Sequence, residues 1–193
     1  MEKLDYSSLA SGSDAFNKLK NDYASGNVSH AYLFVSPDEL FLTLLSRTFA
    51  ALCISGNENS AAAELVINGL HADVKIYPEA DENGKRRESV LTADIDAITE
   101  TLYYRPTAGE KKFYIIERGE TMNASCQNKL LKTLEEPPES AYFIINAADV
   151  SPLLPTVISR CRQIKPAEFS KNDLKAALKE KYPNSERIDA AVS

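Results

Sequence analysis

The chain has 193 residues, of which 44% are hydrophobic and 26% are charged, with a formal net charge of −6 at pH 7. This composition is close to the soluble globular average and excludes the collagen-like, disordered and disulfide-stapled classes. No apolar run approaches the ~20 residues that a membrane-spanning helix needs, and the first ten residues lack the apolar core of a signal peptide. The negative charge argues against autonomous nucleic-acid binding, which needs a concentrated basic face.

Cysteine usage points to a reducing compartment. Cys53, Cys126 and Cys161 are odd in number and too widely spaced for a disulfide framework or a CxxC pair. Disulfides persist mainly in oxidising environments, so we expect a cytoplasmic protein with no membrane partner.

Predicted helices and strands alternate along the first half of the chain. In order, the pattern predicts a helix over 14–25 capped by Ser13 or Asp14, a strand over 31–35, a helix over 38–53, a loop with a short helix over 55–69, and a strand over 74–77. The strands are continuous apolar runs, which is typical of strands buried on both faces. The basic run 85–87 follows an Asn-Gly turn, and we expect it to be a solvated loop.

The alternation continues through the second half. It predicts a helix over 92–103 capped by Thr92, a strand over 113–116, a helix over 123–135 with Met122, Cys126, Leu130 and Leu134 as its core stripe, a strand over 142–145, a short helix over 151–158, and an edge strand over 161–164. Strands separated by helices indicate a parallel sheet covered on both faces.

The last residues have a different pattern. Ser170 begins a predicted helix that Pro183 breaks, and a second helical pattern then runs to the chain end. One helix and a fragment cannot bury a core by themselves. We therefore expect residues 1–166 to form one α/β domain and residues 167–193 to be the truncated beginning of a helical lid domain.

Four stretches together resemble the clamp-loader branch of the AAA+ ATPases. They are SHAYLF at 29–34, KFYII at 112–116, NKLLKTLEEPP at 128–138 and LPTVISRC at 154–161. The motif residues are Leu130, Leu131, Glu135, Glu136, Pro137 and Pro138 of the third stretch and Ser159, Arg160 and Cys161 of the fourth. These two motifs are typical of bacterial DNA polymerase III clamp loaders, with delta-prime subunits the most similar class and gamma/tau subunits second. The resemblance implies a three-layer α/β/α P-loop NTPase (AAA+) domain with a mainly parallel sheet.

The sequence departs from this family's ATPases where nucleotide would bind. Residues 35–43, VSPDELFLT, contain neither the glycines nor the lysine of GxxxxGK[ST], and Asp38 and Glu39 would repel a phosphate at the helix N-terminus. Glu117-Arg118 stands where those ATPases have Asp-Glu, and a guanidinium cannot accept a proton. We interpret Glu117 as a surface acid. Alanines in Asn146-Ala147-Ala148 replace the residue that senses the γ-phosphate. We therefore expect no nucleotide cofactor and no intrinsic ATPase activity.

The same comparison predicts no zinc. The family's zinc knuckle has four cysteines, and this region offers only Cys53 and His71. A structural zinc site needs four nitrogen or sulfur ligands. We expect Cys53 to be a core residue at a helix end and His71 to make structural hydrogen bonds.

Arg160 is the remaining candidate functional residue. The resemblance implies that it is an arginine finger directed at the ATP of a neighbouring subunit, because a planar, permanently charged group stabilises charge on a transferring phosphoryl group. The alternatives are that Arg160 pairs with an acid such as Glu168 or only caps the short helix. Arg162 is expected to be merely exposed.

The resemblance as a whole implies a role in DNA replication. It implies a nucleotide-independent subunit that assembles with gamma/tau and delta subunits, within a DNA-directed DNA polymerase holoenzyme, to load the sliding clamp on primed DNA. Two alternatives stay open: a divergent active AAA+ ATPase of the gamma/tau type, and a purely structural scaffold in which Arg160 is dispensable.

Overall fold

The computed structural model describes residues 7–57, 59–83 and 85–167. Its helices are α1 (Ser7–Gly12), α2 (Asp14–Ala24), α3 (Glu39–Ser55), α4 (Ala61–Ile67), α5 (Thr92–Leu102), the 3-10 turn η1 (Gly119–Thr121), α6 (Ala124–Glu135) and α7 (Pro155–Ile158). Its strands are β1 (Ala31–Val35), β2 (Val74–Tyr77), β3 (Lys112–Ile116), β4 (Ala141–Ala147) and β5 (Arg162–Ile164). Each strand that the sequence predicts is present, and α1 is an addition.

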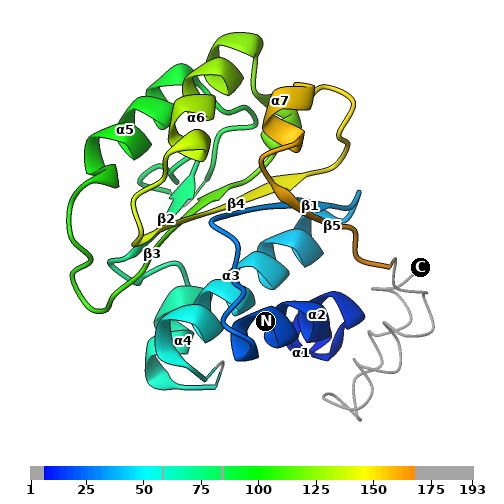
Figure 1. The fold of residues 1–193 in the computed structure, drawn as a ribbon, viewed down its shortest axis with the longest axis vertical. Helices are drawn as coiled ribbons and strands as arrows, with labels where there is room; N and C mark the ends of the chain where they lie inside the picture. The colour runs from blue at the N-terminus through cyan, green and yellow to red at the C-terminus, as the bar shows by residue number, and fades with distance from the viewer. Residues whose placement is uncertain (1–6, 58, 84, 168–193) are drawn as a thin grey trace.

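All five strands form one parallel sheet in the order β2-β3-β4-β1-β5. Helices α1 to α4 cover one face, and α5, α6 and α7 cover the other (Figure 1). This arrangement confirms the predicted three-layer α/β/α architecture and the predicted edge strand. The expected lid helices over 170–193 lie outside the described residues.

The two faces of the sheet bury separate apolar clusters. Phe16, Phe49 and Phe113 are at most 1% exposed and pack between the sheet and α1–α4. On the other face Leu130 and Phe143 are fully buried beneath α5–α7. Burial of both faces explains why β1, β3 and β4 read as continuous apolar runs.

The structure decides one predicted boundary between its two candidates and differs from the prediction at two others. Of the two candidate caps of α2, Ser13 is the cap, and its hydroxyl accepts the Phe16 N–H at 3.1 Å. Thr92 is not a cap: Leu91 holds that position, and the Asp94 carboxylate accepts the Leu91 N–H at 2.8 Å. The short helix begins only at Pro155, because proline fits a first helical turn where its missing N–H costs nothing.

A buried glutamine joins α6 to the segment that enters α7. The Gln127 amide nitrogen donates to the carbonyl oxygens of Met122 and Pro152 at 2.9 and 3.0 Å. Its amide oxygen accepts the Leu154 N–H at 2.6 Å. Since the side chain is only 2% exposed, these bonds replace the water that it would otherwise need. The register between α6 and α7 is thereby fixed.

No helix in the described part of the chain is long and apolar enough to cross a membrane.

A test of the packing at the end of β3 uses Gly119. A Cβ atom there would overlap Cγ2 of Ile145 and come within 3.3 Å of the Asn146 carbonyl oxygen. We expect Gly119→Ala to lower the free energy of unfolding by about 1–3 kcal/mol, the usual cost of overpacking. Urea unfolding measures this change. Gly109→Ala is the control, because its Cβ would meet nothing within 4 Å, and equal losses in both variants would contradict the packing.

Candidate functional site

A cavity of about 360 Å³ lies where β1, β3 and β4 end. Ligands of parallel α/β sheets bind outside the carboxyl ends of the strands, so this is the position to inspect for a nucleotide site. Its lining residues come from the start of α3, from the segments after β2 and β3, and from the end of β4: Glu39, Leu40, Leu42, Thr43, Pro78, Arg86, Arg87, Glu117, Arg118, Glu120, Asn146, Ala147 and Ala148.

The N-terminus of α3 is capped by the chain's own acid. The Asp38 carboxylate accepts the Phe41 N–H at 2.9 Å, and the Asp38 N–H is donated to the Ser36 hydroxyl at 3.2 Å. Helix N-termini bind phosphate through free N–H groups and the positive end of the helix dipole. Here the Asp38 carboxylate already accepts one of these N–H groups, and it lies at the positive end of the helix dipole, where a phosphate would bind. The predicted placement of Asp38 is confirmed.

Glu117 is the centre of an ionic network and not the surface acid that we expected. Its side chain is 15% exposed, and one carboxylate oxygen accepts the Thr43 hydroxyl at 3.1 Å. The guanidinium groups of Arg47 and Arg86 lie 3.5 and 3.6 Å from the carboxylate. The sequence interpretation was wrong because Arg47 and Arg86 are distant in the chain, and nothing near Glu117 indicates a cationic partner.

The network around Glu117 compensates the desolvation of the Arg47 guanidinium. Burial lowers the pKa of this guanidinium, and the nearby Glu117 carboxylate opposes that shift. One Arg47 nitrogen donates to the Ile67 carbonyl at 3.0 Å. Its Nε is buried without a hydrogen-bond partner in the part of the chain that the structure describes. A buried charge needs a counterion, so Arg47 and Glu117 depend on each other.

The basic run 85–87 is not simply the solvated loop that the sequence predicts. Arg86 Nη1 donates to the Ile76 and Pro78 carbonyl oxygens at 2.9 and 2.6 Å. Arg87 pairs with Asp94 at 2.5 Å. Two of the three basic side chains therefore fold back onto the domain, and Arg86 joins the edge of β2 to Glu117.

Arg118 is also paired within the chain. Its φ of 56° is left-handed, a conformation that turns the backbone sharply after β3. Its Nε lies 3.1 Å from a Glu39 carboxylate oxygen, and its Nη1 lies 3.3 Å from the Arg87 carbonyl oxygen. The position where the family's ATPases have a catalytic base thus holds a cation bound to the first residue of α3.

The end of β4 adds one buried amide to the cavity wall. Asn146 is 3% exposed, and its Nδ2 donates to the Ser46 hydroxyl at 3.0 Å. Its Oδ1 has no hydrogen-bond partner among the described residues. Ala147 and Ala148 follow, and they offer only backbone groups, one of which is the Ala148 N–H bound to Glu120 at 3.0 Å.

The cysteines are core residues. Cys53 packs on the α1–α4 side of the sheet, and Cys126 and Cys161 pack on the other. Burial raises the pKa of Cys53 and of Cys161 to about 12, which keeps both thiols protonated and poor as metal ligands. His71 makes the expected structural bond, with Nδ1 accepting the Asp73 N–H at 3.1 Å. Within residues 7–57, 59–83 and 85–167, no group of three or more His, Cys, Asp or Glu could hold a metal.

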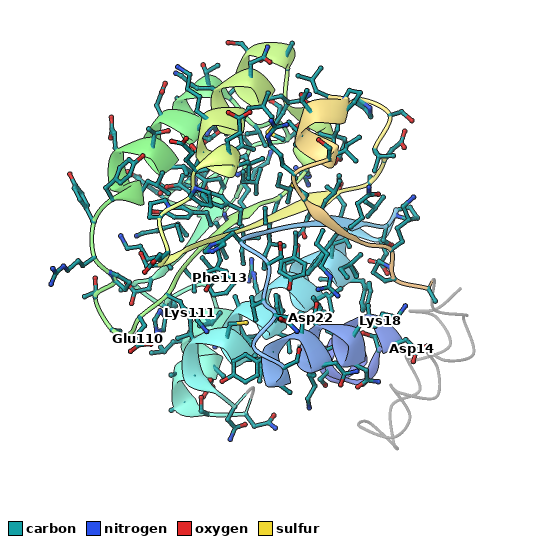
Figure 2. The ribbon with its side chains drawn as sticks, in the orientation of Figure 1. Asp14, Lys18, Asp22, Glu110, Lys111 and Phe113 are labelled. Atoms are coloured by element: carbon teal, nitrogen blue, oxygen red, sulfur yellow. The ribbon has the colours of Figure 1, made fainter. Side chains whose placement is uncertain are left out.

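Arg160 lies outside the cavity, immediately after α7. Its Nη2 donates to a Glu135 carboxylate oxygen at 2.5 Å, and its Nη1 donates to the Thr156 carbonyl at 2.9 Å. The side chain is 34% exposed. The bond to Thr156 matches the helix-capping alternative, whereas Glu168 lies outside the described residues. Arg162 is paired as well as exposed, with 2.8 Å to Asp22, which Figure 2 shows on the opposite side of the sheet from α5–α7.

The motif at 128–138 and the motif at 154–161 meet where Glu135 contacts Arg160. Leu130 and Cys161 are buried, and Leu131 packs against the same cluster. Glu135 is the last residue of α6, and Glu136 follows as an exposed C-cap. Pro137 and Pro138 turn the chain toward β4, with the Pro138 carbonyl accepting the Ala141 N–H at 2.9 Å. The hydroxyl of Ser159 bonds to the Thr156 carbonyl at 3.1 Å. The contact between Glu135 and Arg160 could not be predicted from the sequence, because the two residues are far apart along the chain.

Comparison with known proteins agrees with the fold and the motifs. The strand order and the three layers define a parallel α/β/α domain. A gamma subunit-related protein of DNA polymerase III from Thermotoga maritima has the same fold: it superposes with a TM-score of 0.62 at 24% identity, over 90% of this chain and 55% of that one. Residues 12–170 match the family model described as DNA polymerase III, delta subunit. The chain therefore belongs to this family of clamp-loader proteins.

Two curated relatives show how far the resemblance extends. The tau subunit of DNA polymerase III from Bacillus subtilis is 31% identical over 152 residues, which are 75% of this chain and 26% of that protein. The delta-prime subunit from Escherichia coli is 31% identical over 157 residues, which are 76% and 45%. The chain spans less than half the length of these relatives, and identity does not separate the two subunit classes.

The Glu117 network predicts a specific loss of stability. Glu117→Ala leaves Arg47 buried without its counterion, so we expect the free energy of unfolding to fall by about 2 kcal/mol. Glu39→Gln breaks the exposed pair with Arg118 and should change it by at most about 1 kcal/mol. Chemical denaturation of both variants provides the comparison. A larger loss from Glu39→Gln would mean that Glu117 is not the centre of the network.

Proposed function

We propose that this chain is a nucleotide-independent, delta-prime-like subunit of a bacterial clamp loader. The observation that carries the proposal is that charged side chains lining the cavity where nucleotide would bind are paired with other side chains of the same chain. Arg86 and Arg47 face Glu117, and Arg118 pairs with Glu39. The glycine-rich loop and its lysine, which cradle phosphates in P-loop proteins, are missing from residues 35–43.

Membership in the family supports the proposed partners. Relatives named gamma, tau and delta-prime subunits of DNA polymerase III share this domain. The proposed assembly contains gamma/tau and delta subunits and loads a sliding clamp on primed DNA in the cytoplasm. In this proposal residues 1–166 form the AAA+ domain, and residues 167–193 begin the lid.

Arg160 is the group that we propose acts on nucleotide. It contributes nothing to the cavity of its own subunit, and about a third of its side chain is accessible. An arginine supplied in trans needs no nucleotide site on its own chain, because it stabilises charge on the phosphoryl group held by a neighbour. The two features, a cavity whose charged lining is already paired and an exposed arginine outside it, fit one role.

A structural scaffold is the second candidate function. The observation in its favour is the ion pair between Arg160 and Glu135, which gives the guanidinium a partner within the chain. The scaffold and the finger make different predictions for Arg160. The third alternative is an active ATPase. This chain lacks the P-loop lysine and the carboxylate pair that such an enzyme needs.

Titration with nucleotide tests whether this cavity binds ATP. We expect isothermal titration of the chain with Mg-ATP to show no heat above dilution and no shift in melting temperature. The reason is that Asp38 and Glu39 place negative charge at the helix N-terminus and no lysine offsets it. A micromolar dissociation constant would contradict nucleotide independence and favour the gamma/tau-like ATPase.

Substitution of Arg160 separates the finger from the scaffold. In the full-length subunit, rebuilt with gamma/tau, delta, clamp and primed DNA, we expect Arg160→Ala to preserve assembly and to lower stimulated ATP hydrolysis. A finger is worth roughly 10³-fold at its own site, although other sites dilute the loss in the total. Arg160→Lys should be little better, since ammonium lacks the planar fork.

Arg162→Ala is the matched control. Arg162 is exposed and paired with Asp22, two residues along the chain from Arg160. The Arg162→Ala variant should leave ATP hydrolysis unchanged. Full activity of Arg160→Ala would leave the scaffold role, and failure to assemble would make Arg160 an interface residue.

A further inference from the structure

We propose that Glu135 is a positioning residue that holds Arg160 ready for the phosphate of a neighbouring subunit. The inference rests on the proposed function and adds a residue to it. It follows from the juxtaposition of the end of α6 with the end of α7, which brings an acid and the candidate finger together although they lie in different sequence motifs.

The geometry fixes the guanidinium from two sides. Glu135 accepts from Nη2 at 2.5 Å, and the Thr156 carbonyl accepts from Nη1 at 2.9 Å. One contact comes from α6 and the other from α7. Two contacts to different nitrogens restrict both the position and the plane of the group, whereas a single contact would leave it free to rotate.

Both anchoring elements are themselves rigidly placed. Gln127 of α6 binds the backbone on either side of Leu153, which leads into α7. Leu130 of α6 and Val157 of α7 are fully buried in the same apolar cluster. Packing in the core therefore fixes the separation between the Glu135 and Arg160 backbones, and the ion pair forms across that fixed separation.

The held arginine still has donors for a phosphate. A guanidinium has five N–H groups, and the two contacts use two of them. Three remain, and the side chain is 34% exposed. Because the group is already ordered, less rotamer entropy is lost when it meets a ligand.

Stability alone does not account for the acid at this position. Glu135 is the last residue of α6, where the helix dipole disfavours a carboxylate. The pair is exposed on both sides, and exposed ion pairs contribute little to folding. A glutamate that is unfavourable for its helix and weakly useful for folding is explained by what it does to Arg160.

The test is Glu135→Gln in the full-length subunit within the rebuilt clamp loader. Glutamine keeps the shape and removes the charge. We expect kcat of clamp- and DNA-stimulated ATP hydrolysis to fall by roughly tenfold at the dependent site, with KM for ATP and the melting temperature unchanged. Asp96→Asn is the matched control, because it breaks an equally exposed ion pair to Lys129 of the same helix. That control should leave kcat unchanged.

A double-mutant cycle tests whether Glu135 acts through Arg160. In an Arg160→Ala background we expect Glu135→Gln to have no further effect. Additive losses in the double variant would overturn the inference. An unchanged kcat in Glu135→Gln would also overturn it. An increased kcat in Glu135→Gln would overturn it too, and would mean that Glu135 keeps Arg160 away from the neighbouring nucleotide. If Arg160→Ala itself has no effect, the proposed finger fails. Loss in Arg160→Ala without loss in Glu135→Gln refutes only the positioning role.

Discussion

The carboxylate of Glu117 and the buried guanidinium of Arg47 compensate each other at the edge where three strands end. Each charge would destabilise the fold without the other, because a largely desolvated ion that loses its partner costs free energy. Arg86 and Thr43 complete the set and tie β2 and α3 to the end of β3. The layers on this side of the molecule are therefore joined by charge as well as by apolar packing.

This network changes what the edge of the sheet can bind. In a P-loop ATPase the corresponding donors are aimed at phosphate and metal, and they become satisfied only when ligand arrives. Here Arg118 is satisfied by Glu39, and the start of α3 is satisfied by Asp38. Arg118 and the start of α3 thus gain partners by folding alone, and this pairing is the physical basis of the proposal that the domain does not depend on nucleotide.

The sequence predicts the sheet well because burial on both faces leaves continuous apolar runs such as Phe113–Ile116. It also shows that the segment after β1 is not a P-loop sequence, since residues 35–43 contain neither glycine nor lysine. It does not predict the partners of Glu117, because Arg47 and Arg86 approach from other elements. Nor does it predict that Glu135 meets Arg160, since 25 residues and a strand separate them. Local patterns define elements, whereas charge pairing depends on the tertiary fold.

The chain path from β4 to α7 connects the cavity at the strand ends with Arg160. Asn146 and Ala148 belong to the cavity wall, and the Ala148 N–H is held by Glu120. A few residues later Leu154 is held by Gln127 at the entry to α7. In this chain both ends of the path are held by internal hydrogen bonds, to Glu120 at one end and to Gln127 at the other, so the segment that leads to Arg160 is anchored by the chain's own side chains.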